Sequence, residues 1–421
     1  MARPRFTVTV ILVLTMSAAA ADWPQFQGPN RNGIAPEGKV TRAWPEGGPP
    51  LLWSANLGPG FAGPAIRDGN VYVLDRIPDT QDVLRCLDLA DGQELWRFAY
   101  DAPGKLSENG SRTTPTVDDK YVFIIGPFGH FHCVDKATRK PIWQKHLLED
   151  YESKLPNWGV AQSPLLYKDA VIVAPLGKKI GVMAFEKATG RELWRSGPIA
   201  VMAYSSPLMA TVDGVEQVVM GGNNRTGGVD VTSGELLWTY SAWRCGIPIP
   251  SPTPIGDGRF FITGGYDAGS AMFKVQRQQG KFTVQELFRV KELGSQIHNA
   301  LLHQGHLYLG CNTNSKQDGL VCMDLEGNVK WKTGRSPHFE RGNYILADGV
   351  LVIMDGRTGV LRLVEPDPAG YKELAQAQVL SRRPIWAPMA FSDGKLIVRD
   401  QRQMKCLDLR PPKPTSAPGS P

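Results

Sequence analysis

One motif recurs along the chain at nearly regular intervals. The stretch LADGQELWRF at 89–98 is nearly repeated as KATGRELWRS at 187–196 and as VTSGELLWTY at 231–240. Successive copies of the aligned position are separated by 43, 47, 51, 44, 50, 43 and 44 residues. A period in the forties indicates a repeat architecture. The aligned residues are Trp53, Trp96, Trp143, Trp194, Trp238, Phe288, Trp331 and Ala375.

The sequence upstream of each motif copy recurs as well. Short runs rich in Val, Ile and Tyr follow an Asp-Gly or related turn, as in DGNVYVL at 68–74, DGRFFIT at 257–263 and DGVLVIM at 348–354. Such turns supply the positive φ angles of a tight hairpin. Each unit therefore predicts four short strands, and no helical period of useful length appears. The fold class that we expect is all-β.

The two ends of the repeat region predict how the fold closes. The region opens with PLLWSANL at 50–57, a fourth-strand motif with no first three strands before it. It ends with three strands between Trp386 and Leu409 and no Leu-Trp strand after them. Four-stranded units in series bury both faces by stacking around an axis. We expect an eight-bladed β-propeller over 50–410, whose last blade is closed by the N- and C-terminal strands.

The segments outside the propeller carry export and tail signals. Residues 1–21 combine Arg3 and Arg5, an apolar stretch and the small residues Ala19-Ala20-Ala21, which is typical of a signal peptide. An uncleaved membrane anchor is the alternative. Residues 22–49 form a lead segment, and 411–421 predict a disordered Pro/Ser-rich tail. We expect an exported, monomeric protein of the periplasm or the extracellular space, with no transmembrane segment.

Net charge and the positions of the cysteines bear on nucleic-acid binding and on disulfide formation. The formal net charge of +6 becomes +4 without the signal peptide, which is too weak and dispersed for nucleic-acid binding. Four of the six cysteines, Cys86, Cys133, Cys322 and Cys406, occupy one repeated position. Equivalent positions of separate units should lie beyond disulfide reach, so we expect free buried thiols.

The D-x-x-T-G-x-x-L-W pattern, seen from Glu186 to Trp194 with Glu replacing Asp, resembles the pyrroloquinoline-quinone (PQQ) type propeller repeat. The stretch WPQFQGPNRNG at 23–33 resembles the leader of exported bacterial proteins of this type. The resemblance implies kinship with quinoprotein dehydrogenases and with the noncatalytic assembly scaffold BamB. It also implies an adjacent Cys-Cys pair and calcium-binding carboxylates for a dehydrogenase. Neither can be matched here, so we expect no cofactor, catalytic residue or metal; PQQ and calcium belong only to the alternative reading.

Function is expected on the long, varied loops at the face opposite the tight turns. Stretches such as NWGVAQSP at 157–164 and RRPIWAP at 382–388 precede each first strand, and their side chains should ring the mouth of the axis. The alternative is that Ser/Thr-Pro begins a strand and that tryptophans plug the channel. The candidate ligand or partner residues are Trp158, Gln162, Tyr204, Arg244, His298, Asn299, Arg341 and Trp386.

The remaining histidine motifs favour a structural role. His130 and His132 share one strand face, as zinc or copper ligands can, but no third ligand is evident. We therefore expect a binding or scaffold protein for a small polar ligand or an envelope protein. The alternatives are a quinone-dependent oxidoreductase and, third, a sugar- or polymer-binding module.

Overall fold

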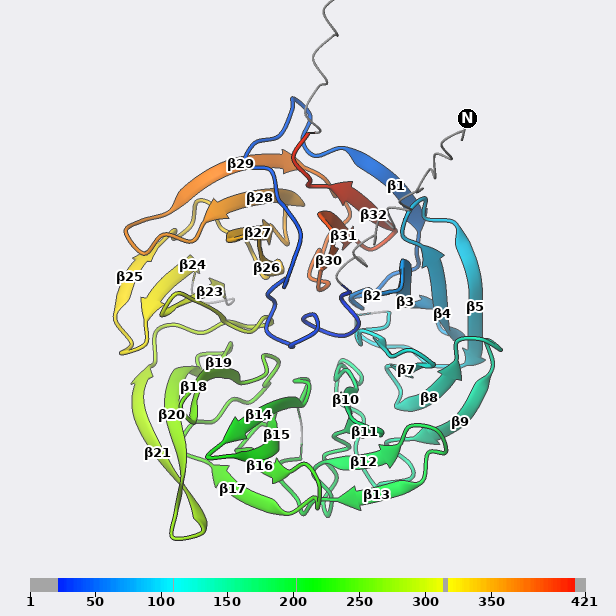
Figure 1. The fold of residues 1–421 in the computed structure, drawn as a ribbon, viewed down its shortest axis with the longest axis vertical. Coiled ribbons are helices and arrows are strands. Elements are labelled where there is room, and N and C mark those ends of the chain that lie inside the picture. Colours follow the sequence, from blue (N-terminus) through cyan, green and yellow to red (C-terminus); the bar gives the residue numbers. More distant parts are fainter. Residues whose placement is uncertain (1–21, 109, 202, 313–316, 413–421) are drawn as a thin grey trace, which may run out of the picture.

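The fold is a closed ring of β-sheets. The computed structural model describes residues 22–108, 110–201, 203–312 and 317–412. Within these ranges the chain forms eight four-stranded antiparallel sheets around one axis and no helix (Figure 1). The predicted all-β, eight-bladed propeller is confirmed. The signal-peptide prediction for 1–21 and most of the predicted tail, 413–421, lie outside the described residues.

The first four blades follow the chain in order, each with its innermost strand first. Blade 1 comprises β2 (Ala65–Arg67), β3 (Asn70–Ile77), β4 (Gln81–Asp88) and β5 (Glu94–Asp101). Blade 2 comprises β6 (Thr116–Val117), β7 (Tyr121–Ile125), β8 (His130–Asp135) and β9 (Pro141–His146). Blade 3 comprises β10 (Leu165–Tyr167), β11 (Ala170–Val173), β12 (Met183–Glu186) and β13 (Glu192–Arg195). Blade 4 comprises β14 (Leu208–Val212), β15 (Val215–Gly221), β16 (Thr226–Asp230) and β17 (Leu236–Tyr240).

The last four blades continue this order until the termini meet. Blade 5 comprises β18 (Thr253–Gly256), β19 (Arg259–Gly264), β20 (Gly269–Gln278) and β21 (Lys281–Val290). Blade 6 comprises β22 (Leu301–His303), β23 (His306–Asn312), β24 (Gln317–Asp324) and β25 (Val329–Lys332). Blade 7 comprises β26 (Tyr344–Ala347), β27 (Val350–Met354), β28 (Val360–Glu365) and β29 (Lys372–Gln378). Blade 8 comprises β30 (Ala390–Ser392), β31 (Lys395–Arg399), β32 (Gln403–Asp408) and β1 (Leu51–Asn56).

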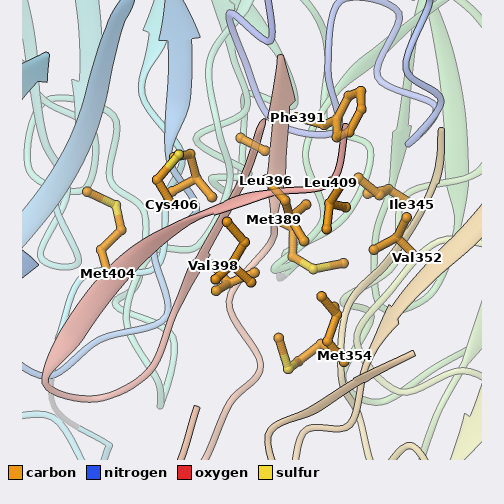
Figure 2. Packing of buried hydrophobic residues seen from close by; sticks show 14 of the residues in the cluster. Ile345, Val352, Met354, Met389, Phe391, Leu396, Val398, Met404, Cys406 and Leu409 are labelled. Carbon is orange, nitrogen blue, oxygen red and sulfur yellow. The ribbon is translucent and has the colours of Figure 1, made fainter. Parts of the chain in front are cut away.

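Blade 8 closes the ring as the sequence predicts. Strand β1 pairs antiparallel with β32, with Trp53 opposite Cys406, so the first strand of the chain completes the sheet begun by the last three. The buried side chains between blades 7 and 8, among them Ile345, Met389 and Phe391, pack into one apolar cluster (Figure 2). The edge of β32 is thereby covered by β1, which becomes the outer strand of the blade.

The tight turns have the conformation expected from Asp-Gly. Asp348 and Gly349 both have positive φ angles, 48° and 71°. In blade 1 the turn after β4 lies beside the turn after β2, because the Leu89 amide donates to the Gly69 carbonyl at 2.8 Å. Both kinds of turn therefore lie at one face of the ring, and the long loops lie at the opposite face.

The repeated tryptophans fasten neighbouring blades. The Trp194 indole, only 9% exposed, donates from Nε1 to the carbonyl of Val231 in the next blade at 3.0 Å. A Cβ on Gly234, which has φ +78°, would lie 2.7 Å from the Trp194 ring, so glycine is required there. The repeat motif is thus an inter-blade contact. The Nε1 groups of Trp53, Trp143 and Trp331 donate to the next blade in the same way.

All six cysteines are free and buried, which confirms the prediction for the four that share the repeated position. Burial raises the pKa of the Cys86 thiol to about 12 and that of Cys245 to about 11. A thiol with such a pKa is protonated and unreactive at neutral pH.

The lead segment 22–49 runs across the axis (dark blue, Figure 1). Trp23, 1% exposed, exchanges two backbone hydrogen bonds with Ile66 of blade 1, and Ile34 bridges to Leu346 of blade 7. The Arg31 guanidinium donates to the carbonyl of Pro207 at 2.8 Å and also to that of Pro164. Blades on opposite sides of the ring are thereby joined through one segment. No helix in the described part of the chain has the length and apolarity needed to cross a bilayer.

Candidate functional site

A belt of side-chain hydrogen bonds joins the entries of successive inner strands. The Ser163 hydroxyl accepts from the Thr114 amide at 2.9 Å, and the Ser206 hydroxyl accepts from the Ser163 amide at 2.8 Å. Ser251 repeats this contact with the Ser206 amide at 3.0 Å. The Ser-Pro sequences therefore have a structural role, as the alternative reading of these stretches proposed. These hydrogen bonds hold the starts of the first strands of blades 2 to 5 in register with one another.

Above this belt, the loops enclose a cavity of about 300 Å³ at the axis. We call it the axial cavity. Every blade contributes one of eight wall residues, and Phe26 of the lead segment adds a further ring. Two tryptophans, Trp158 and Trp386, line this cavity. The eight are Phe61, Arg112, Trp158, Tyr204, Tyr266, Gln296, Arg341 and Trp386, from blades 1 to 8 in that order.

One wall of the axial cavity is a column of rings and guanidinium groups. Phe61 and Trp386 stack with centroids 5.6 Å apart and planes inclined by 25°. Arg112 lies 5.2 Å from the Phe61 centroid, and Arg341 lies 5.1 Å from the Trp386 ring. Cation–π contacts of this kind hold a guanidinium flat against an aromatic face. This wall therefore presents positive charge beside apolar surface.

The opposite wall combines phenols, an indole and an amide. Trp158 lies 5.5 Å from Tyr204 and stacks on Tyr266 at 6.4 Å, measured between ring centroids. The Gln296 amide donates to the Tyr266 hydroxyl at 2.8 Å and accepts from Arg341 Nε at 2.8 Å. Burial raises the pKa of both tyrosines, so their hydroxyls stay neutral. Hydrogen bonds thus connect the phenol wall to the arginine wall.

The two arginines of the axial cavity differ in their partners. Arg341 forms an ion pair with Glu340 at 3.1 Å. Arg112 donates to the backbone carbonyls of Gly110 and Glu108, at 2.7 and 2.6 Å, and no carboxylate of the described residues pairs with it. Burial lowers the pKa of Arg112 to about 10, which leaves it charged at neutral pH. Arg112 is therefore a cation in the wall of an aromatic cavity, and the Glu108 carboxylate, which also lines this cavity, acts on it without forming a direct ion pair among the described residues.

His298 is held in one tautomer at the edge of the axial cavity. Its Nε2 lies 3.1 Å from the Arg341 carbonyl, which only accepts, so Nε2 carries the proton. Its Nδ1 accepts from the Asn343 amide at 3.1 Å. Burial lowers the pKa of His298 to about 4, so the ring is neutral at physiological pH. His298 positions the Arg341 backbone more than it presents a charge.

Five of the eight candidate residues meet at this cavity: Trp158, Tyr204, His298, Arg341 and Trp386. The other three do not line it. The Gln162 amide bonds the Ala174 backbone, and the Asn299 Oδ1 continues the belt by accepting from the Ser251 amide at 2.8 Å. Arg244 is exposed on the loop face. The expectation that these three residues line the mouth is therefore corrected. The side-chain amides of Gln162 and Asn299 are bonded to backbone groups, and the side chain of Arg244 lies outside the cavity.

Four wall residues were not singled out from the sequence. Arg112 and Gln296 lie in ENGSRTTP and SQIHNA, stretches that precede first strands, so the signal for them was present. Phe61 lies in the corresponding GPGFAGP stretch of blade 1. Tyr266 comes from the turn between β19 and β20, where no sequence signal indicates the axis.

The described residues contain no cluster of the side chains that most often hold metal ions. No group of three or more His, Cys, Asp or Glu side chains within the described ranges could hold a metal ion. His130 and His132 lie 5.4 and 4.2 Å from the Tyr100 ring, measured between centroids, inside the interface of blades 1 and 2. None of the six cysteines lines the axial cavity. What the cavity provides is flat apolar surface and guanidinium donors.

The floor of the axial cavity depends on the lead segment. Phe26 lines the cavity, while Arg31, five residues on, is anchored by its bonds to Pro164 and Pro207 and by a 3.0 Å bond from its Nε to Gln25. Burial lowers the pKa of Arg31 to about 9, and no carboxylate of the described residues pairs with it. The WPQFQGPNRNG stretch therefore has a structural task, to seat Phe26 beneath the mouth.

Comparisons with known proteins place the fold. The chain matches the family model described as outer membrane protein assembly factor BamB over residues 79–333. No curated protein matches it. The BamB structure from Moraxella catarrhalis is 16% identical, covers 85% of this chain and 97% of that chain, and has a TM-score of 0.59.

Two quinoprotein structures are similar to a comparable degree. The quinohemoprotein alcohol dehydrogenase from Comamonas testosteroni is 13% identical, with 96% of this chain and 83% of that chain covered and a TM-score of 0.63. A europium-containing methanol dehydrogenase is 13% identical, with 91% and 88% covered and a TM-score of 0.65. At these identities the likeness shows the fold alone.

Proposed function

Because the chain belongs to the family described as outer membrane protein assembly factor BamB, whose members are PQQ-like propellers, we propose that it is a binding protein and not an enzyme. The axial cavity is the binding site. It receives an aromatic or apolar group of a ligand or partner protein at the loop face. Trp158, Tyr204, Arg341 and Trp386, all proposed from the sequence, form part of its walls.

The observation that carries this proposal is the convergence of rings from separate blades on one cavity. Stacked or edge-on aromatic pairs contribute about 0.5–1.5 kcal/mol beyond the area that they bury. A cavity with several half-exposed rings gains that energy only when a guest fills it. Trp158 and Trp386 are both half-buried, so each has free surface for such a guest.

A neutral aromatic probe tests the cavity without invoking charge. Binding of 2-naphthol, followed by calorimetry, is expected in the wild type and absent in the double variant Arg341→Ala with Trp158→Ala. The melting temperature of the variant should stay close to that of the wild type. Failure of 2-naphthol to bind, or a large loss of stability in the variant without probe, contradicts the proposal, since the residues would then act as a plug.

A quinone-dependent oxidoreductase is the second candidate. Flat rings beside Arg112 and Arg341 suit a planar compound that bears carboxylates, such as PQQ. The missing cation donors argue against it. Anaerobic titration with PQQ, with and without calcium, tests the point by absorbance and fluorescence. Substrate-dependent dye reduction that requires PQQ would favour this second candidate over the first.

Export is part of the proposal. Residues 1–21 have the features of a signal peptide, and the matched family is described by its role in outer membrane assembly. The mature protein should therefore begin at Asp22 and fractionate with the periplasm or the medium as a monomer. Intact mass of the purified native protein tests the cleavage position directly.

A further inference from the structure

The axial cavity adjoins a second cavity on the loop face. The second, which we call the side cavity, has a volume of about 460 Å³ and borders blades 6, 7 and 8. Both cavities are lined by Arg341 and Trp386, so they meet at this cation–π pair. A ligand seated at the axis can therefore extend past Trp386 into the side cavity.

The two cavities differ in character. Six aromatic residues line the axial cavity, but Trp386 is the single aromatic residue of the side cavity. In the side cavity three arginines, Arg341, Arg357 and Arg383, face one carboxylate, Glu340. The axial cavity joins two arginines and Glu108 to a mostly aromatic lining, whereas the side cavity has the larger excess of positive charge and little aromatic surface.

That excess is available to a ligand. Glu340 is already engaged, since it pairs with Arg341 at 3.1 Å and accepts from the Trp386 indole at 3.2 Å. Arg357 and Arg383 are exposed, and no carboxylate of the described residues forms an ion pair with either guanidinium. Their planar donors match the two oxygens of a carboxylate.

We infer that the loop face binds an extended, acidic segment of a partner protein, with an aromatic side chain in the axial cavity and the following carboxylates on Arg357 and Arg383. The inference rests on the proposed function of the axial cavity. It adds the chemistry of the partner. An extended run of three residues spans about 10 Å, enough to leave one cavity and enter its neighbour.

The energetic roles of the two cavities should differ. Burial of the aromatic side chain supplies most of the affinity, because exposed ion pairs contribute little in water. The arginines supply preference for acidic sequences and a faster association at low salt. The preference should therefore fade as salt is added, while the contribution of the aromatic residue persists.

The test uses capped synthetic peptides and the full mature protein. One peptide carries a phenylalanine followed by three aspartates; a second replaces the aspartates by asparagines; a third replaces the phenylalanine by alanine. N-acetylphenylalanine represents a free small molecule. Calorimetry should rank the first peptide tightest, about tenfold above the asparagine peptide, which corresponds to about 1.4 kcal/mol.

The variants separate this inference from the proposed function. Arg357→Gln with Arg383→Gln should abolish the preference for aspartate over asparagine and leave 2-naphthol binding unchanged. Trp158→Ala should weaken every phenylalanine-containing peptide. Arg244→Gln, an exposed arginine that lines neither cavity, is the matched control and should change nothing. Melting temperatures confirm that each variant folds.

Each alternative outcome is decisive. Equal affinity for the aspartate and asparagine peptides, with 2-naphthol still bound, overturns the acidic partner and leaves the axial cavity as a binding site. Tighter binding of N-acetylphenylalanine than of the first peptide assigns the cavity to a small molecule. If the wild-type protein binds neither 2-naphthol nor any of the peptides, both the proposed function of the axial cavity and the acidic partner are ruled out.

Discussion

The outer tryptophans and the residues around the axial mouth occupy recurring positions of the same repeat, yet they follow opposite rules. At the outer strands of blades 2, 3, 6 and 8 the same residue type makes the same contact, an indole bonded to the next blade. At the mouth the eight blades supply residues of five different types, Phe, Arg, Trp, Tyr and Gln. A repeated position that keeps its chemistry holds the ring together, whereas one that varies its chemistry builds an asymmetric site on a symmetric frame.

The largest effect should come from removing the closing strand. Deletion of residues 22–57 takes away β1 and the lead segment, which exposes the edge of β32 and the floor of the axial cavity. Unpaired strand edges promote aggregation. Size-exclusion chromatography should find aggregates in place of a monomer. A deletion of 411–421 is the control, and a monomeric 22–57 deletion with an unchanged melting temperature would refute the closure.

A matched pair of tryptophan variants tests the comparison itself. Trp194→Ala removes a buried inter-blade contact and should lower the free energy of unfolding by about 3–5 kcal/mol. Trp158→Ala, at the half-buried mouth, should lower it by less than about 1 kcal/mol. Urea denaturation measures both. Equal losses would mean that mouth and outer strands are equally structural.

Two buried histidines, one between blades and one at the mouth, should make the stability of the protein depend on pH. Burial lowers the pKa of His132 and of His298 to about 4 from the ordinary 6.5. Between these values the unfolded chain binds a proton that the folded chain does not, so stability falls as the pH drops from 6.5 to 4. Each histidine can account for up to about 3 kcal/mol of that fall.

The two histidines should nevertheless respond differently to replacement. His132, 3% exposed, has no hydrogen-bond partner for either ring nitrogen in the described part of the chain. His132→Phe should therefore raise stability at pH 5 and flatten the pH profile. His298→Phe should lower stability at pH 7 by about 1–3 kcal/mol, because the Arg341 carbonyl and Asn343 lose their partner. Thermal unfolding across this pH range checks both, and identical profiles would contradict the difference in bonding.

The smallest effect is expected at Arg244. It was a candidate from the sequence, but its side chain is exposed and lines neither cavity. Arg244→Ala should change neither 2-naphthol affinity nor the melting temperature measurably. A clear loss of 2-naphthol binding would show that the binding site extends over blade 5, beyond the residues that line the axial cavity.

These expectations also show what the sequence could and could not predict. The fold was predictable because the outer-strand position repeats in register, and Asp-Gly turns such as Asp348-Gly349 mark the first hairpin of five of the eight blades. The mouth was located because a Ser-Pro or Thr-Pro precedes the first strand in blades 2 to 5, and the stretches before the other first strands occupy the same place in the repeat. Within it, Gln162 and Asn299 were misplaced because polarity alone does not tell whether an amide meets a ligand or the backbone. Tyr266 came from an unmarked turn.

The pairing of β1 with β32 also dictates an order of events. Leu51 finds its partner only at Leu407, almost the whole described chain later. Bringing such distant segments together has a large cost in loop-closure entropy. It is also a non-local step, and such steps are slow in folding. The ring therefore cannot close before its final strand has left the ribosome. Until then the backbone groups of β1 lack their partners on β32. The lead segment that lines the base of the axial cavity likewise has no closed ring to cross. The axial cavity is therefore completed only once β32 has been made, although most of its walls are encoded well before that strand.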